Sequence, residues 1–350
     1  MAEPEQRGAR VTRLLAAAAR LSDASQPESQ ALRARLLETT GLSEAGIALG
    51  LARCLETRAT PGELAALSSS TPPVARALVL LSGSVFVAAL RAIAVGVAAS
   101  EQVVVRASRR DPALAEALHA LVPDLFQLVS ELQPEPGDQL WVYGSNETLA
   151  SVRASLPAGV WLHAHGHGLG AVVVEPRAGF QATTAARRIA LDTALFDQRG
   201  CLSPRLVCVV GSAGAALELA QALGEQLARL EQELPLGPRG PEQLAEARRQ
   251  RDAAAYAFEL LDAGSGWISL GERVTFPPAP RCLHVVPVAD PVAALQPFAA
   301  HLTCLGVDAT PRVTERLGSA FGGVRLTELG EMQRPPLDGP VDRRTVAELV

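Results

Sequence analysis

The chain contains one cysteine whose neighbours could make it a nucleophile. Cys201 lies in the segment FDQRGCLSPR (residues 196–205), directly after Gly200 and between two arginines. A cysteine reacts as its thiolate, and nearby cations such as Arg199 and Arg205 stabilise a thiolate. A glycine at position 200 would let a substrate approach the backbone closely. The alternative is a structural cysteine that precedes a strand, and the local sequence leaves both interpretations open.

The remaining cysteines and the nearby carboxylates have weaker claims to chemistry. Asp197 and Glu175 are acidic candidates that we expect to pair with arginines. The cysteines form no CxxC pair, so a disulfide framework and a zinc ribbon are excluded. We expect the other four to fill the core or the surface: Cys54, Cys208, Cys282 and Cys304.

A second candidate is the basic turn VVVRASRRDP (residues 103–112). On a doubly wound sheet, a polar turn that follows a strand lies beside the ribose of a bound dinucleotide. Forked guanidinium groups in that turn could bind a 2′-phosphate, which favours NADP over NAD. The alternative is a solvated basic turn with no ligand. The residues that we assign to cofactor binding here are Arg106, Ser108, Arg109 and Arg110.

A third candidate is the turn that contains Gly144 and Ser145, which follows a predicted strand at residues 139–143. A helix starts there, and the backbone N–H groups at a helix start can bind phosphate. The usual dinucleotide pattern GxGxxG follows none of the predicted strands. The assignment of Gly144 and Ser145 to cofactor binding therefore needs support from other parts of the chain.

Three histidines alternate at His163, His165 and His167. On a continuous strand they would share one face, where three imidazoles could bind zinc. However, Gly166 and Gly168 predict that the strand breaks here, which would scatter the rings. We therefore expect no metal site and a structural or lining role. His167 stays a candidate catalytic residue, either as a general base or as part of a polar wall.

The elements that must position these residues follow from the hydrophobic pattern. Residues 9–68 have helical periodicity, with a capping box at residues 60–63. From residue 77, short apolar strands alternate with helices, which predicts right-handed crossovers and parallel, doubly wound sheets. The predicted helices include residues 87–99, 147–155, 183–195 and 213–234, and the predicted strands include residues 139–143, 160–164, 171–174 and 206–210.

We predict an α/β fold with two doubly wound lobes and an N-terminal helical segment. Residues 1–70 form the helical segment, and residues 71–165 form the lobe that would bind a dinucleotide. Residues 166–325 form the lobe that carries Cys201, and residues 326–350 form an extended C-terminal tail.

The composition excludes several classes of protein. A net charge of −5 argues against general nucleic-acid binding, which favours basic surfaces. The chain contains no run of about 18 apolar residues, so we expect no membrane span. The apolar stretch at residues 14–21 lacks the layout of a signal peptide. We expect a soluble, cytoplasmic protein.

The order of these segments resembles the LuxC-type acyl-CoA reductases, a branch of the aldehyde dehydrogenase superfamily. DQRGCLSPR resembles the family's nucleophile motif, with Cys201 in the thiolate position. The turn at residues 103–112 resembles the superfamily's KPS-x-x-P ribose turn, and GSNE (residues 144–147) resembles the turn over the nicotinamide. RLTELGEM (residues 325–332) and PPLDGP (residues 335–340) resemble the family's C-terminal segment. The resemblance implies an aldehyde-dehydrogenase-like fold.

The resemblance also implies a reaction. Cys201 would accept the acyl group of an acyl-CoA or acyl-carrier thioester, and NADPH would reduce the acyl group to an aldehyde. The Cys201 backbone N–H would be one donor to the oxyanion. Ser84 follows Gly83 where the superfamily has an asparagine amide as the second donor, and Arg106 replaces the usual ribose-binding lysine. An acyl-protein synthetase and a second copy of the chain are the candidate protein partners.

Aldehyde-oxidising relatives have a glutamate base that would fall near His165 or His167, and its absence here fits reduction. Two other classes of function stay open. One is an inactive family member that binds an acyl carrier or a protein, which Ser84 and Arg106 favour. The other is a cysteine acyltransferase or thioesterase that uses no dinucleotide.

Overall fold

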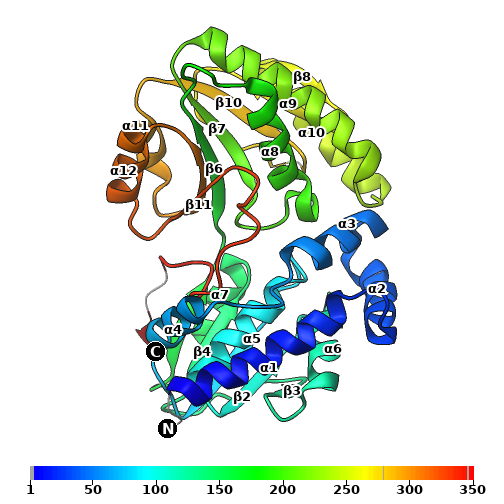
Figure 1. The fold of residues 1–350 in the computed structure, drawn as a ribbon, viewed down its shortest axis with the longest axis vertical. Coiled ribbons are helices and arrows are strands. Elements are labelled where there is room, and N and C mark those ends of the chain that lie inside the picture. Colours follow the sequence, from blue (N-terminus) through cyan, green and yellow to red (C-terminus); the bar gives the residue numbers. More distant parts are fainter. Residues whose placement is uncertain (1–3, 279, 345–346) are drawn as a thin grey trace. The chain divides into compact units, whose positions relative to one another are not determined.

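The computed structural model describes residues 4–278, 280–344 and 347–350. They form an α/β protein that divides into two compact units, each built on one sheet with helical crossovers (Figure 1). Unit 1 contains residues 1–167 and 336–350, and unit 2 contains residues 168–335. The predicted class, two doubly wound α/β lobes with helices at the N-terminus, is confirmed.

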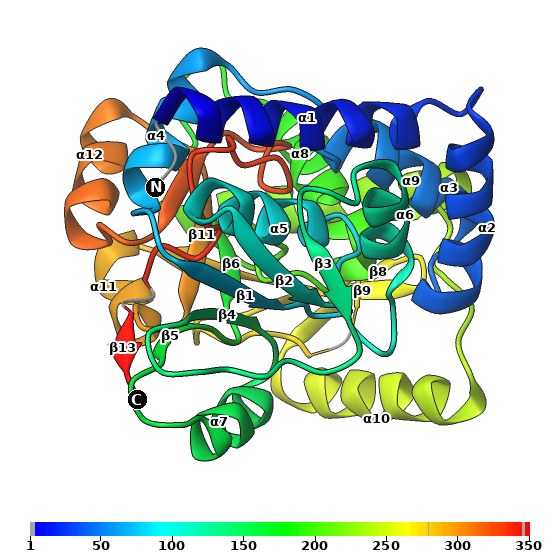
Figure 2. The same cartoon turned by 90° about the horizontal axis from the view of Figure 1, so that it is seen from below.

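Unit 1 begins with helices that pack outside its sheet. Leu14, Leu15 and Ala18 on α1 are buried, and α1 packs against α5, which lies on the sheet (Figure 2). The predicted capping box forms, because Thr60 Oγ1 accepts a hydrogen bond from Glu63 N at 3.2 Å. The helices of unit 1 are α1 (Pro4–Ser22), α2 (Pro27–Thr40), α3 (Glu44–Leu49), the π-helical turn Gly50–Cys54, α4 (Pro61–Ser70), α5 (Ala88–Ala99), α6 (Ala113–Leu121) and α7 (Asn146–Ser155).

The sheet of unit 1 has the strand order β13-β5-β4-β1-β2-β3, and only β13 among these described strands is antiparallel to its neighbour. From β1 the chain adds β2 and β3 on one side, and then β4 and β5 on the other. The order therefore reverses between β1 and β4, and such a switch point is where open α/β sheets bind ligands, outside the carboxyl ends of the strands. The strands are β1 (Arg76–Leu80), β2 (Gln102–Arg106), β3 (Gln127–Val129), β4 (Gln139–Tyr143), β5 (Trp161–His165) and β13 (Glu348–Leu349).

The sheet of unit 2 has the order β12-β11-β6-β7-β10-β9-β8, with β8 antiparallel to β9 and the other pairs parallel. Because β6, β7 and β11 are adjacent and parallel, their amino ends lie at one edge. The strands are β6 (Leu169–Val174), β7 (Pro204–Val210), β8 (Glu259–Ala263), β9 (Gly266–Leu270), β10 (Leu283–Val288), β11 (Leu302–Asp308) and β12 (Arg325–Thr327). The helices are α8 (Ala182–Ala194), α9 (Ala213–Glu233), α10 (Pro241–Ala257), α11 (Pro291–Leu295) and α12 (Pro311–Ala320), with 3-10 turns at Leu195–Gln198 and Gln296–Phe298.

The unit boundaries differ in detail from the four parts expected from the sequence. The N-terminal helices belong to unit 1, and the chain enters unit 2 after His167. The segment expected as one extended tail is divided at Pro335, and it contributes β12 to unit 2 and β13 to unit 1. The prolines at positions 335, 336 and 340 predicted an extended chain without sheet pairing. In the structure, β12 before them pairs with β11, and β13 after them pairs with β5.

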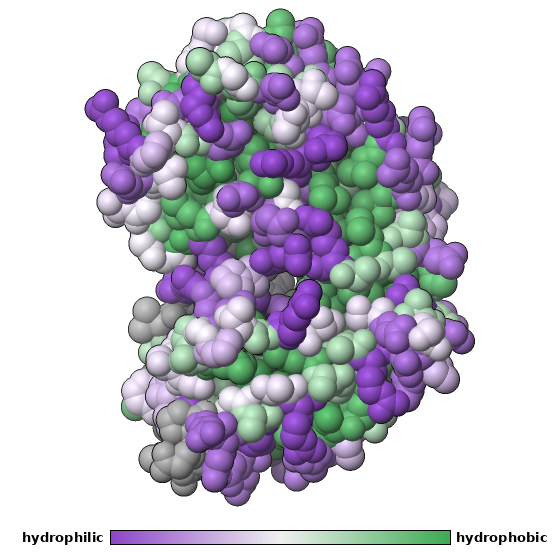
Figure 3. Space-filling model, viewed as in Figure 1, coloured by the Kyte–Doolittle hydropathy of each residue, from purple (hydrophilic) through white to green (hydrophobic). Residues whose placement is uncertain are grey.

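The surface mixes polar and apolar side chains. On the face shown in Figure 3, hydrophilic side chains interrupt the hydrophobic ones. None of the helices in the described part of the chain is long and apolar enough to cross a membrane.

Candidate functional site

The residues assigned to cofactor binding lie at the carboxyl edge of the unit 1 sheet. Ser84 follows β1, the basic turn follows β2, and Gly144 follows β4. Because β1 has β2 on one side and β4 on the other, all in parallel, the structure brings these three turns to the same edge. This edge includes the switch point between β1 and β4.

The turns after β1 and β2 contact each other at a glycine. A Cβ on Gly83 would lie 2.6 Å from Ser108 Oγ and 3.3 Å from Arg110 Cβ. A larger residue at position 83 would therefore push the basic turn away from β1. Ser108 Oγ also accepts a hydrogen bond from Arg110 N at 3.2 Å, which holds the turn closed, and Ser84 itself is exposed.

The guanidinium groups of the basic turn face solvent to different degrees. Arg109 and Arg110 are exposed and Arg106 is half-buried. Among the described residues, the side chains of Arg106 and Arg109 form no hydrogen bond or ion pair, whereas Arg110 acts on the neighbouring carboxyl of Asp111. Two guanidiniums at this edge therefore have all their donors available for an anion.

The third turn is ordered by helix capping. Ser145 Oγ accepts from Thr148 N at 3.2 Å and caps α7, and a Cβ on Gly144 would lie 3.1 Å from the Thr148 side chain. The hydroxyl of Ser145 is therefore already used by the helix, which leaves backbone N–H groups as the donors of this turn. The amide of Asn146 accepts from His167 N at 3.2 Å, so exposed His167 lies beside the same turn.

The two preceding histidines form ring stacks on the sheet. His163 stacks on Trp141 with ring centroids 4.3 Å apart, and His165 stacks on Tyr143 at 4.6 Å. Burial lowers the pKa of both imidazoles to about 4, so both rings are neutral at neutral pH. β5 ends at His165, as the glycines predicted, and no group of metal-ligating side chains occurs within the described ranges.

Cys201 lies at the amino edge of the unit 2 sheet, in the turn before β7. Thr303, at the start of β11, donates from Oγ1 to the Cys201 carbonyl at 2.5 Å and to the Leu169 carbonyl at 3.2 Å. A Cβ on Gly168 would lie 3.0 Å from Cys201 Cβ and 2.4 Å from Thr303 Cγ2. The starts of three strands therefore enclose the cysteine, and only a glycine fits at position 168.

Exposure separates Cys201 from the other cysteines. Cys201 is half-buried, whereas Cys54, Cys208, Cys282 and Cys304 are buried. Burial raises the pKa of the Cys208 and Cys282 thiols to about 12, and it raises the pKa of Cys304 as well. A high pKa suppresses the thiolate, so the structure favours Cys201 as the reactive thiol.

The backbone just before Cys201 is strained. Phe196, Asp197 and Gln198 have φ values of 54°, 50° and 60°, which is the left-handed region. A non-glycine residue in this conformation costs about 1–2 kcal/mol. Strain of this kind persists only where the surrounding contacts over-determine it.

Those contacts come from buried polar side chains. Asp197 forms an ion pair with Arg281 at 3.0 Å and accepts a hydrogen bond from Gly237 N at 3.1 Å. The Gln198 amide donates to the carbonyls of Pro204 at 2.6 Å and Cys282 at 2.7 Å. The expectation that Asp197 pairs with arginines is confirmed, and the carboxylate of Glu175 instead accepts from a backbone N–H, that of Thr310, at 2.7 Å.

One part of the sequence argument for Cys201 needs correction. Arg205 was expected to stabilise the thiolate, but its guanidinium donates to the carbonyls of Pro277 at 2.7 Å and Gln198 at 2.9 Å. Arg199 forms an ion pair with Asp197 at 3.4 Å. Closeness in sequence suggested cations beside the thiol, whereas the turn directs Arg205 to backbone carbonyls.

The C-terminal segment of unit 2 also reaches the cysteine turn. Gln333 Nε2 donates to Ser203 Oγ at 3.1 Å, two residues after Cys201. Buried Asp192 holds this segment by accepting from Gly330 N at 2.6 Å and Met332 N at 3.1 Å. No local sequence pattern predicts the contact between Gln333 and Ser203, or the ion pair that Arg281 forms with Asp197.

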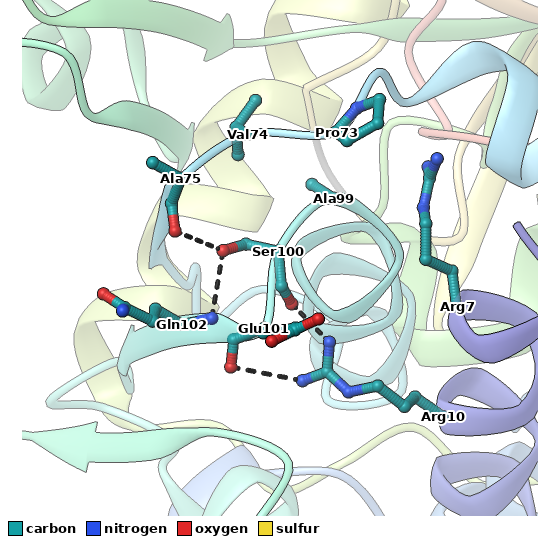
Figure 4. Close-up of a pocket in the computed structure, with 9 residues that line it drawn as sticks. All are labelled: Arg7, Arg10, Pro73, Val74, Ala75, Ala99, Ser100, Glu101 and Gln102. Carbon is teal, nitrogen blue, oxygen red and sulfur yellow. Dashed lines mark hydrogen bonds between the residues drawn. The ribbon is translucent and has the colours of Figure 1, made fainter. Parts of the chain in front are cut away.

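A cavity in unit 1 lies at the other edge of the sheet. Its volume is about 320 Å³, and it lies at the amino ends of β1 and β2, opposite the edge described above (Figure 4). Arg7 and Arg10 line it, and both guanidiniums bind backbone carbonyls at the end of α5, including that of Ser100 at 2.5 Å from Arg10. These arginines cap a helix, so they are not available to bind an anion.

Residues 127–342 match the family described as acyl-CoA reductase (LuxC). A search of the curated proteins gave no match. The range includes Gly144, Ser145, His167 and Cys201, whereas Ser84 and the basic turn precede it.

Several solved structures have a similar fold. An oxidoreductase from Marinobacter aquaeolei has a TM-score of 0.67 and 12% identity, covering 100% of this chain and 86% of its own. An NAD-dependent aldehyde dehydrogenase from Sinorhizobium meliloti has a TM-score of 0.67 and 14% identity, covering 98% and 79%. A variant of proline utilization A from Bradyrhizobium japonicum has a TM-score of 0.65 and 14% identity, covering 100% of this chain but only 45% of its own.

Proposed function

Because this chain belongs to the LuxC acyl-CoA reductase family, we propose that it reduces an acyl thioester to an aldehyde through an acyl group carried on Cys201. Membership of this family and the aldehyde-dehydrogenase-like fold support an oxidoreductase. The observation that supports Cys201 as the nucleophile is the difference in solvent exposure among the cysteines. Cys201 is half-buried at a strand edge, whereas the other four are buried.

The first step is a transfer between sulfur atoms. The Cys201 thiolate attacks the thioester carbonyl, a new carbon–sulfur bond forms, and the bond to the leaving thiol breaks. The leaving thiolate takes up a proton. The oxyanion of the addition step needs donors, and each donor of this kind is worth about 3–4 kcal/mol in other enzymes. We assign the Cys201 N–H and the Ser84 hydroxyl to this task, and His167 to a polar wall or general base.

The second step needs a hydride donor, and we propose NADPH, which supplies that hydride when bound. The carboxyl edge of unit 1 fits such a group in three respects. It includes the switch point of the sheet, Gly83 lets the turn that carries Ser108 pack close to β1, and Arg106 and Arg109 have unused donors for a 2′-phosphate. Collapse of the reduced adduct would release the aldehyde and regenerate the Cys201 thiolate. No water-activating base is needed for this sequence.

The substrate would be an acyl-CoA or an acyl-carrier thioester. The test is to mix the purified protein with acyl-CoA and follow its intact mass, then to add NADPH and assay for aldehyde. We expect one acyl group per chain, mapped to the peptide that contains Cys201, and aldehyde after NADPH is added. An adduct on another cysteine would contradict the mechanism. If no adduct forms, an inactive scaffold that binds an acyl carrier becomes the better account.

A further inference from the structure

We propose that Asp197, Gln198 and Arg281 are positioning residues that hold the turn before Cys201 in its strained conformation. The proposal rests on the proposed function in one respect, since it takes Cys201 as the nucleophile. It assigns a task to three buried polar side chains that the reaction itself does not use.

The distribution of strain carries the inference. Within the described residues, the non-glycine residues with positive φ are Phe196, Asp197, Gln198 and Arg281. The first three are consecutive and end three residues before Cys201. The fourth, 83 positions further along the chain, binds the carboxylate of the second. The left-handed non-glycine residues in the described part of the chain thus belong to one cluster, which is the arrangement expected where strain serves a site.

The ion pair within this cluster is almost completely removed from water. Asp197 is 3% exposed and Arg281 is 2% exposed, and their side chains meet at 3.0 Å. Arg281 also donates to the Leu234 carbonyl at 2.7 Å, and Asp197 also accepts from Gly237 N at 3.1 Å. Removing Asp197 would leave the buried Arg281 guanidinium without a counter-charge, and removing Arg281 would leave Asp197 with only the longer ion pair to Arg199 at 3.4 Å. The pair therefore favours one geometry for the turn.

Gln198 closes the turn around the cysteine. Its Nε2 donates to the carbonyl of Pro204, the first residue of β7, so the side chain spans the segment that contains Cys201. The same amide exchanges two hydrogen bonds with the backbone of Cys282, at 2.7 Å from Nε2 to the carbonyl and 3.0 Å from the Cys282 N–H to Oε1. One fully buried side chain therefore fixes both ends of the turn relative to the segment before β10.

Burial also defines what these residues cannot do. A substrate cannot touch side chains that are at most 3% exposed, so their effect must pass through the position of Cys201. A thiol that is displaced by about 1 Å can lose a factor of roughly 100 in a reaction that depends on alignment. A small freely diffusing reagent has no such alignment and senses only the local environment of the thiol.

The experiment compares three variants with the wild type and a matched control. Gln198→Met keeps the side-chain volume but removes all three hydrogen bonds. Asp197→Asn removes the negative charge of the buried ion pair, and Arg281→Lys is the conservative variant that retains its positive charge. Glu56→Gln is the control, because Glu56 forms an ion pair at 2.7 Å with buried Arg91 in unit 1, whereas Cys201 belongs to unit 2. Each protein is assayed for the rate of Cys201 alkylation by iodoacetamide as a function of pH, and for the rate of Cys201 acylation by acyl-CoA.

We expect acylation to fall about 10- to 100-fold in Gln198→Met and Asp197→Asn, and clearly less in Arg281→Lys. The pH profile of alkylation should move in the same two variants and stay unchanged in Glu56→Gln. Wild-type profiles in both folded variants would overturn the proposal. Loss of folded protein in all three variants would also overturn it, because the cluster would then be purely structural.

The two assays separate this proposal from the proposed function. If the wild type is not acylated but its alkylation profile depends on Gln198 and Asp197, the function fails and the positioning role stands. If the wild type is acylated and the variants match it in both assays, the function stands and the positioning role fails.

Discussion

The two sheet edges that carry the predicted residues are held in opposite ways. At the amino edge of the unit 2 sheet, the Cys201 turn is strained and bonded from several directions, by Gln198, Thr303 and Gln333. At the carboxyl edge of the unit 1 sheet, Ser84 and Arg109 are exposed, and Arg109 has no bonded partner among the described residues.

The difference follows from the tasks that we propose. Covalent chemistry requires one atom to stay at one position, which a dense buried network provides. Anion binding requires donors that are still unsatisfied before the ligand arrives, and such donors must face water, because a buried unpaired cation is costly. We call the carboxyl edge of the unit 1 sheet the open edge and the amino edge of the unit 2 sheet the closed edge. Substitutions at the open edge should change the affinity for the cofactor, and substitutions at the closed edge should change the reactivity of Cys201.

The largest effect is expected for Cys201→Ala, which should remove the chemistry of one edge and leave the cofactor binding of the other unchanged. Cys201→Ala should abolish both the acyl adduct and aldehyde formation but leave NADPH binding unchanged, because the basic turn belongs to unit 1. Intact-mass spectrometry and a cofactor titration measure the two outcomes. Cys208→Ala is the control and should still be acylated, since Cys208 is buried within β7. Aldehyde from the Cys201→Ala variant would remove Cys201 from the mechanism.

A smaller effect is expected at the open edge. Arg109→Ala should weaken NADPH binding by about 10- to 100-fold, because a forked contact to a 2′-phosphate is lost. The affinity for NADH, which lacks that phosphate, should change little and serves as the internal control. Equal affinities for both cofactors in the wild type, unaffected by the mutation, would exclude the basic turn from the site.

The pH dependence of stability tests the half-buried imidazole of His163, on β5 of the unit 1 sheet. Burial lowers the folded pKa of His163 to about 4, below its usual value near 6.5 in an unfolded chain. The unfolded chain therefore binds the proton first, so stability is complete above pH 6.5 and declines as the pH falls toward 4. One pKa unit corresponds to about 1.4 kcal/mol, so protonation of this ring should lower the free energy of unfolding by up to about 3 kcal/mol over that window. Urea unfolding at several pH values should show a weaker decline in His163→Gln, and an identical decline would contradict the assignment.

The smallest effect is expected at Ser84. Ser84→Asn should preserve the turnover rate or raise it by about threefold, because an amide donor reaches further than a hydroxyl and would supply the oxyanion contact of the superfamily. Steady-state assays with acyl-CoA and NADPH measure the change. A large loss of turnover in a folded variant would mean that Ser84 does not occupy the donor position.

Much of the architecture could be predicted because its signals are local. The apolar run at residues 206–210 lies within β7, and residues 139–143 form β4 as predicted. The glycines after His165 end β5 where the sequence indicated. The short strand β3 and the strands from β8 onward were not predicted. For β3 and β12, three residues carry too little periodicity to identify a strand.

The candidate site was only partly accessible to the same reasoning. Cys201 stands out in sequence through its neighbours, yet Arg205, one of the two arginines used in that argument, binds backbone carbonyls instead. Arg281 and Gln333, which hold the turn, are far from Cys201 in sequence and lie in no pattern that points to it. Contacts at such separations depend on how the strands are ordered in the sheet.

The sequence by itself determined the fold class and many of the helices and strands between residues 77 and 234, and it singled out Cys201 as a candidate nucleophile, because periodicity, capping and composition act over a few residues. Only the tertiary structure decided the strained turn, the Asp197–Arg281 pair and the contact from Gln333 to Ser203. Those features exist because parallel strands bring the starts of β6, β7 and β11 to one edge, where buried polar groups must find partners in whichever distant segments the sheet places beside them.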